Sequence, residues 1–156
     1  MRDMMFRGLT TEARKYLNSE DIRVAVLITA ADLERVLFLK LVLEKKINPE
    51  LVDRFMLRRY IEWNTKLGLI DKSHENLLRE FNYIRNRTVH ERFFTEKVAS
   101  ESKVLEYVKK IILDTCDFID STRIKTDMKL ERVYSTYLSK KAEEEKRFME
   151  KARKQV

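Results

Sequence analysis

Along most of the chain, apolar residues recur every three or four positions, which is the spacing of helices that bury one face. The most regular run lies between about residues 20 and 46 and predicts a long helix that buries Val26, Leu27, Ala30, Leu33, Leu37, Leu41 and Val42. Ser19 or Asp21 is suited to capping its first turn. A shorter helix is expected before it, over residues 10–18.

Three short signals divide the next part of the chain. Asn48-Pro49 ends the long helix and begins another, because proline disfavours helical geometry in the preceding residue yet fits a first helical turn. Gly68 predicts a left-handed turn, and Asp71 or Ser73 can cap a fourth helix that begins near residue 72. The third helix is expected to bury Leu51, Phe55, Leu57, Ile61 and Trp63, and the fourth to bury Leu77, Phe81, Ile84 and Thr88.

The last third of the chain predicts two further helices. After a break over residues 91–99, a fifth apolar face comprises Val104, Val108, Ile111, Ile112, Thr115, Phe118 and Ile119. From Lys129 onward charged residues dominate, which predicts a projecting helix with a solvated face. With two glycines and one proline, strands are hard to place. We expect an all-α fold, with a bundle of four to five helices over residues 1–120 and a charged helical extension over residues 121–156.

Length and composition predict the number of domains, the cellular compartment and the kinds of ligand. A length of 156 residues and a hydrophobic content of 44% suit one domain with a sizeable core. The single thiol, Cys116, cannot form an internal disulfide, and no apolar signal region follows the charged start, so we expect a cytoplasmic protein. No stretch reaches the ~18 uncharged residues of a membrane span. Two histidines and one cysteine give poor support for a metal site, and no cofactor is expected.

The net charge of +7 is unevenly distributed. Residues 121–156 contain 11 Lys/Arg and 6 Asp/Glu, so this extension carries +5 of the excess. A positive balance favours association with a polyanion such as RNA or DNA, without indicating a sequence or a reaction.

The candidate chemical site is Arg85-Asn86-x-x-x-His90, at the end of the fourth predicted helix. An arginine can hold a phosphate, an imidazole can move a proton near neutral pH, and an asparagine can orient either partner. Asn86 and His90 are four residues apart and share a helix face, whereas Arg85 lies about 140° around the helix from His90. Within one chain, Arg85 would have to bend its long side chain around the helix to approach His90.

The residues around this motif follow a recognisable order. It comprises Leu67-Gly68-Leu69-Ile70-Asp71, then Leu78-x-x-Phe81-x-x-Ile84-Arg85-Asn86-Arg87-x-x-His90-Glu91, and the acidic position Leu33-Glu34 in the long early helix. Together these residues resemble the signature of the HEPN superfamily, all-helical domains named for higher eukaryotes and prokaryotes nucleotide-binding. The resemblance covers about residues 20–120.

The resemblance implies a homodimer in which the motifs of both chains line one cleft, and in many members a metal-independent ribonuclease activity. Arg85 would bind the scissile phosphate, Asn86 would orient His90 or the phosphate, and His90 would be the general acid or base. Attack by the neighbouring 2′-hydroxyl of RNA would leave a 2′,3′-cyclic phosphate. Arg87 and Arg92 would add phosphate contacts. A toxin or defence effector with an antitoxin partner fits this activity.

Other interpretations stay open at this stage. The motif also resembles the branch that contains the mannitol operon repressor, so a non-catalytic regulatory, RNA-binding or scaffold module is the main alternative. Toxins paired with a nucleotidyltransferase antitoxin often have a tyrosine where this chain has Arg92, which argues against that modification. Arg85 could form a buried ion pair with Glu34, as a supporting residue, and His90 could cap its own helix. The charged C-terminal helix could dock an assembly partner.

Overall fold

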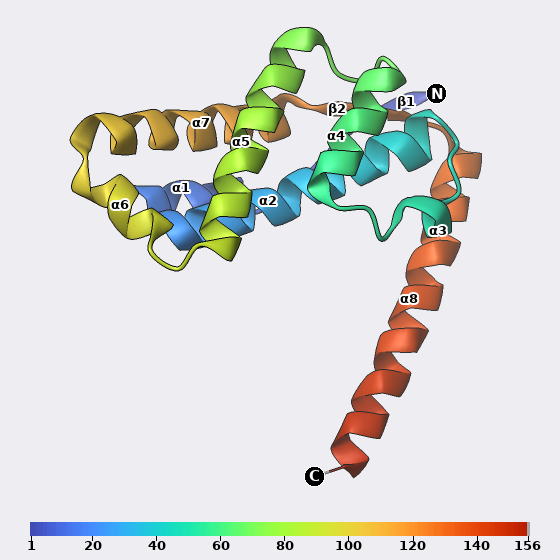
Figure 1. The fold of residues 1–156 in the computed structure, drawn as a ribbon. Coiled ribbons are helices and arrows are strands. Elements are labelled where there is room, and N and C mark those ends of the chain that lie inside the picture. Colours follow the sequence, from blue (N-terminus) through green and yellow to red (C-terminus); the bar gives the residue numbers. More distant parts are fainter. Residues whose placement is uncertain (156) are drawn as a thin grey trace.

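Helices form most of the computed structural model, which describes residues 1–155, and this confirms the all-α class (Figure 1). The elements in chain order are β1 (Arg2–Met5), α1 (Thr10–Asn18), α2 (Ile22–Leu39), η1 (Lys40–Glu44), α3 (Pro49–Val52), α4 (Leu57–Lys66), α5 (Lys72–His90), α6 (Phe94–Ser100), α7 (Ser102–Ser121), β2 (Arg123–Thr126) and α8 (Met128–Lys154).

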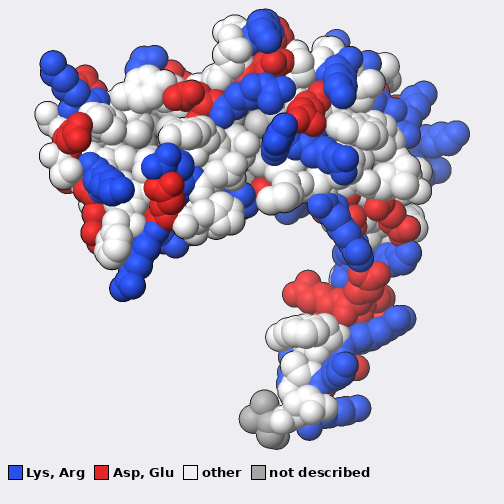
Figure 2. Space-filling model, viewed as in Figure 1, with Lys and Arg blue, Asp and Glu red and all other residues white. Residues whose placement is uncertain are grey.

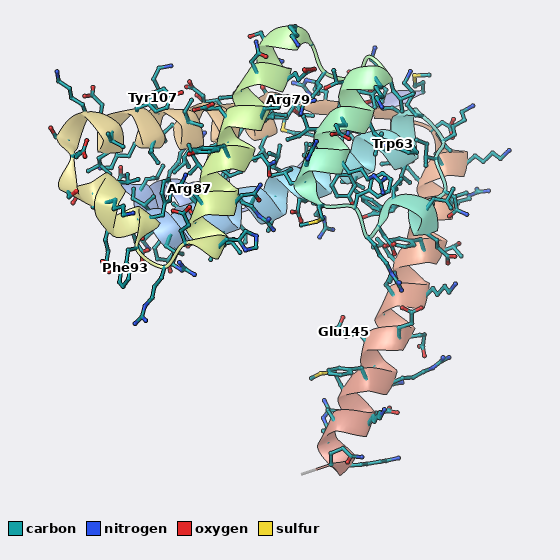
Figure 3. The ribbon with its side chains drawn as sticks, in the orientation of Figure 1. Trp63, Arg79, Arg87, Phe93, Tyr107 and Glu145 are labelled. Atoms are coloured by element: carbon teal, nitrogen blue, oxygen red, sulfur yellow. The ribbon has the colours of Figure 1, made fainter. Side chains whose placement is uncertain are left out.

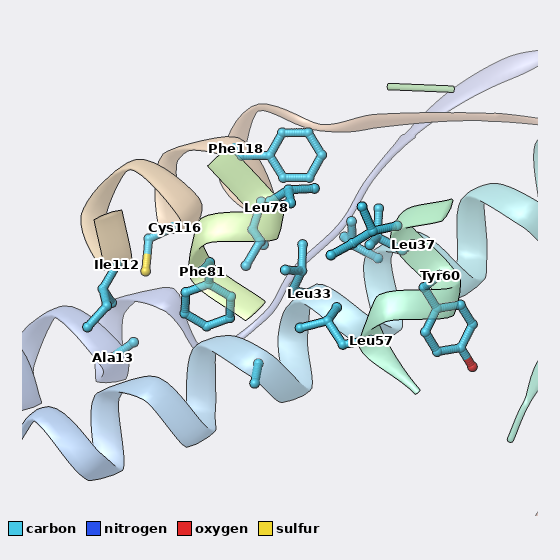
Figure 4. Packing of buried hydrophobic residues seen from close by; sticks show 14 of the residues in the cluster. Ala13, Leu33, Leu37, Leu57, Tyr60, Leu78, Phe81, Ile112, Cys116 and Phe118 are labelled. Carbon is cyan, nitrogen blue, oxygen red and sulfur yellow. The ribbon is translucent and has the colours of Figure 1, made fainter. Parts of the chain in front are cut away.

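The hydrophobic core lies where α2, α5 and α7 pack together, with α1 and α4 at its sides (Figure 4). Phe81 of α5 is fully buried and lies among Leu33 of α2 and Ile112 of α7. Burying one such side chain contributes about 1.5–3 kcal/mol. This burial fixes which face of α5 points inward and therefore which face presents the candidate motif.

The helix boundaries show the expected capping chemistry. The Asp21 carboxylate accepts the backbone N–H of Val24 at the start of α2, and Asp71 accepts that of His74 at the start of α5. Asp71, and not Ser73, is therefore the cap of the motif helix. Gly68 has a φ of 71°, as predicted for a left-handed turn.

Some expected core positions are wrong at the edges of the apolar faces. Helix α5 buries Leu78, and Leu77 is only half-buried. The flanking positions of other faces reach solvent because a neighbouring helix covers only part of each face. Exposed residues that were expected inside are Leu27, Leu51, Trp63 and Val104.

The long early helix does not run as one α-helix to Lys46. It changes at Lys40 into a five-residue π-helical segment, η1, which ends at Glu44. Lys46 follows in the left-handed region with a φ of 57°, a conformation that favours glycine or asparagine. The chain thus leaves the helix through two consecutive backbone irregularities.

Two features were not expected from the sequence. Strand β1 pairs antiparallel with β2, so that Arg2 lies opposite Thr126 and Met5 opposite Arg123. Residues 91–99, expected as a break, contain most of α6, which buries only Val98. The strands have four residues each and α6 has seven, so none is long enough to show a clear period in the sequence.

Helix α8 projects away from the body, as predicted (Figure 1). Its first half packs on η1 and α3, and its Tyr134 and Tyr137 lie against the ring of Phe38 near the end of α2. Lys141 forms an ion pair with Asp53 at 3.0 Å, and none of the residues of α8 is fully buried. Among residues 1–155 there is no helix with the length and apolar character needed to cross a membrane.

Candidate functional site

Helix α5 presents the motif because its buried stripe turns the neighbouring positions outward. Phe81, Ile84 and Thr88 are buried, and the Thr88 hydroxyl donates to the carbonyl of Ile84 at 2.8 Å. Arg85 and Asn86, beside this stripe, are half-buried at the edge of the core. A side chain at such an edge is restrained by its neighbours and remains open to a ligand.

The guanidinium of Arg85 has two partners, Glu34 and Asn86. Its Nη2 lies 3.9 Å from Glu34 Oε1, and its Nη1 donates to Asn86 Oδ1 at 3.1 Å. The side chains of Arg85 and Glu34 are 21% and 33% exposed. Burial raises the pKa of Glu34, and the positive charge of Arg85 opposes that rise. The expected ion pair between the early helix and the motif helix is present, but its contact is loose.

His90 is the last residue of α5, and it is exposed. A basic residue in the last turn suits the negative end of the helix dipole. The final turn is closed by the backbone N–H of Glu91, which donates to the carbonyl of Arg87 at 2.9 Å. Within residues 1–155, Arg85 is paired with Glu34 and Asn86 and not with His90, so one chain does not bring the arginine and the histidine together.

Sequence reasoning missed Arg23, which holds the motif helix in place. Its Nη1 donates to the carbonyl of Thr88 at 3.0 Å, in the last turn of α5. The contact uses a carbonyl near the helix end, where the dipole also favours a cation. The two residues are separated by 65 positions, so no local pattern in the sequence could have indicated it.

Arg87 is held by aromatic and acidic neighbours (Figure 3). It donates to the Tyr83 hydroxyl at 2.8 Å, forms an ion pair with Glu91 at 2.6 Å, and lies over the rings of Tyr83 and Phe94. These contacts fasten the end of α5 to α6. The spacing of four residues from Tyr83 to Arg87 was the available sequence signal.

Arg92 is the freer of the two additional arginines. It is exposed, and its guanidinium lies 5.3 Å from the centre of the Phe93 ring. Phe93 is itself 52% exposed, in the turn between α5 and α6 (Figure 3). The turn therefore offers a cation and an aromatic ring next to His90 in the chain.

A hollow of about 230 Å³ lies on the other side of Glu34. It is lined by Ala31, Glu34, Arg35, Phe38, Asp53, Phe55, Tyr60 and Tyr137. Burial raises the pKa of Tyr60 to about 12, and its hydroxyl donates to the carbonyl of Val52. Tyr60 is therefore a fixed wall of this hollow rather than a proton donor to a ligand.

The surface around the motif is mixed in charge. Figure 2 shows Lys and Arg side chains interspersed with Asp and Glu over the face that carries α4, α5 and α6. Within residues 1–155, no three His, Cys, Asp or Glu side chains gather as a candidate metal site. No family model, no curated protein and no solved structure matches the chain.

Proposed function

We propose that the chain is a HEPN-like, metal-independent endoribonuclease that acts as a homodimer. The observation that carries the proposal is the state of the motif on α5. Arg85 is half-buried and directed by Glu34 and Asn86, while His90 stands exposed at the helix end. A positioned cation that can still exchange its partner and an accessible imidazole are the two groups that transesterification of RNA requires.

In this proposal Arg85 binds the scissile phosphate and stabilises the negative charge that develops on it. The 2′-hydroxyl loses its proton to a general base, and its oxygen attacks the phosphorus. The bond from phosphorus to the 5′-oxygen then breaks, and a general acid protonates the leaving oxygen. His90 supplies one of these proton transfers. The products are a 2′,3′-cyclic phosphate and a free 5′-hydroxyl.

The dimer is required because Arg85 and His90 of one chain lie about 140° apart around the helix. A second chain related by a two-fold axis would bring its own His90 toward the Arg85 of the first. The loose contact with Glu34, at 3.9 Å, leaves Arg85 able to exchange a carboxylate for a phosphate. Arg92 would add a phosphate contact, whereas Arg87 is largely occupied by Tyr83 and Glu91.

The test is to incubate the purified protein with total and synthetic RNA in EDTA and to analyse the fragment ends. His90→Ala should abolish cleavage and leave the fold intact, because the side chain is exposed. His74→Ala is a matched control, since His74 is the other histidine and lies in the first turn of the same helix. Cyclic phosphate ends from the wild type and His74→Ala, but not from His90→Ala, support the proposal.

A non-catalytic regulatory, RNA-binding or scaffold module is the second candidate. It is favoured by the structural use of the motif, since Arg85 links α5 to α2 and Arg87 fastens α5 to α6. The projecting half of α8 would then serve as a docking element for a partner. Intact RNA with the folded, dimeric wild type would favour this candidate, as would lower thermal stability of His90→Ala with unchanged RNA binding.

A further inference from the structure

A cavity of about 480 Å³ lies away from the motif, where four parts of the chain meet. Its walls come from η1, from the turn at Gly68 and Leu69, from β2, and from the first turn of α8. Its volume is in the range of small-molecule sites, about 300–1,000 Å³. Leu69 is followed closely by the start of α5, so the cavity lies near the opposite end of that helix from His90. Helix α5 runs from Lys72 to His90, and the helical rise separates its two ends by about 27 Å.

Basic residues dominate the cavity wall. Five of the lining residues are Lys or Arg, namely Lys40, Lys45, Lys46, Arg123 and Lys125, and two are acidic. The wall therefore has a net charge of +3. Clustered cations in a concave surface raise the local concentration of anions.

Both carboxylates in the wall already have partners in the chain. Glu44 lies 2.9 Å from the ammonium of Lys40, and it accepts the backbone N–H of Lys125. Asp127 caps α8 by accepting the backbone N–H of Leu130 at 2.9 Å. The remaining cations, Lys45, Lys46, Arg123 and Lys125, make no ion pair with a carboxylate among residues 1–155.

The backbone around the cavity is irregular on one wall and extended on the other, and both walls contribute cations to the lining. The π-helical segment η1 and the left-handed Lys46 lie next to each other on one wall. A lysine in the left-handed region costs about 1–2 kcal/mol, and such irregularities concentrate at functional sites. On the other wall β2 alternates, with Ile124 buried and Arg123 and Lys125 exposed on the same face.

We propose that this cavity binds a small molecule carrying two or more phosphate groups. Four unpaired cations match a multiply charged anion better than a single carboxylate or phosphate. Leu43, Leu69 and Leu130 add an apolar part to the wall, against which an organic portion of the ligand can pack. The site stands independently of the proposed nuclease activity, because it uses neither Arg85 nor His90.

Isothermal titration calorimetry tests the proposal with two probes, inorganic tripolyphosphate and ATP. The double variant Arg123→Gln/Lys125→Gln removes two exposed cations of the cavity. Its matched control is Arg147→Gln/Lys151→Gln, which removes the same charge from exposed positions of α8. We expect the wild type to bind one probe molecule per chain. The control variant should have the same Kd as the wild type, and the cavity variant should bind at least about tenfold more weakly.

The two probes separate the possible sources of the phosphates. Similar affinity for both indicates a site for the polyphosphate itself, and tighter binding of ATP indicates a nucleoside polyphosphate. A wild type that binds neither probe overturns the proposal, as does equal weakening of the cavity variant and the α8 control. Loss of binding in Arg85→Gln would also overturn it, by placing the anion at the motif. If the cavity variant is unfolded by circular dichroism, Lys45→Gln/Lys46→Gln replaces it with the same expected loss.

Discussion

The contact between Arg85 and Glu34 yields a quantitative prediction about how firmly the motif arginine is held. The perturbation is a double-mutant cycle with Arg85→Gln, Glu34→Gln and the two changes together. Glutamine has the shape of glutamate without its charge, and at position 85 it removes the charge while keeping a polar amide. The cycle therefore isolates the interaction between the two charges.

The geometry sets the expected magnitude. Two unit charges 3.9 Å apart attract by about 4 kcal/mol at an effective dielectric constant of ~20 and by about 1 kcal/mol at the value for water, ~80. The side chains are 21% and 33% exposed, and the distance is close to the limit for an ion pair. Solvent screening therefore favours the lower figure, and we expect a coupling free energy of about 1 kcal/mol at neutral pH.

The assay is urea unfolding of the four proteins at pH ~7 and pH ~4. Burial raises the pKa of Glu34 above its ordinary value of 4.5, so Glu34 is mostly protonated at the lower pH. Arg85→Gln raises that pKa further, because the opposing positive charge is lost. Its loss of stability should be present above the pKa of Glu34 and should diminish as the pH falls through it.

A coupling below about 0.3 kcal/mol at both pH values would contradict the reasoning, because the two charges would then not interact. A coupling that grows as the pH falls would contradict the assignment of the carboxylate to Glu34. The expected result also bears on the proposed function. An interaction of about 1 kcal/mol is weak enough for an incoming phosphate to displace Glu34 from Arg85.

Three further predictions follow from packing. Phe81→Ala should lower the free energy of unfolding in a urea titration by about 3–5 kcal/mol, because Phe81 is fully buried. Phe93 is exposed, so Phe93→Ala should change that free energy by less than about 0.5 kcal/mol. Burial raises the pKa of the Cys116 thiol, so labelling with a thiol reagent should require unfolding, and rapid labelling of the native protein would contradict its position. Ending the chain at Lys141 should leave the melting temperature nearly unchanged, since residues 142–151 are exposed. Tyr137→Ala should lower it, because Tyr137 is half-buried and its contact with Phe38 is lost.

Local signals in the sequence predicted the parts of the fold that depend on neighbouring residues. Asp71 and Gly68 placed the start of the motif helix, because capping and left-handed turns are decided within a few positions. The pairing of β1 with β2 could not be predicted in this way. Strand β2 has only four residues, in which two exposed positions alternate with two buried ones, and its partner strand lies about 120 positions away.

The contacts of the candidate site could be predicted only in part. The ion pair of Arg85 with Glu34 was expected as one alternative, and the structure contains it. The hydrogen bond from Arg23 to the last turn of α5 was not expected, because nothing local distinguishes Arg23 from other surface arginines. The contact of Arg87 with the ring of Phe94 depends on α6, a helix that the sequence pattern did not indicate.

The pairing of β1 with β2 also constrains when the protein can finish folding during its synthesis. Arg2–Met5 is translated first among the elements, yet its partner Arg123–Thr126 emerges only after seven helices. At about 5–20 residues per second, the first strand waits roughly 6–25 seconds for its partner. During that interval Arg2 and Asp3 place charges on an unpaired strand, which discourages pairing with other nascent chains. The pairing of β1 with β2 is therefore possible only after helices α1 to α7 have been synthesised.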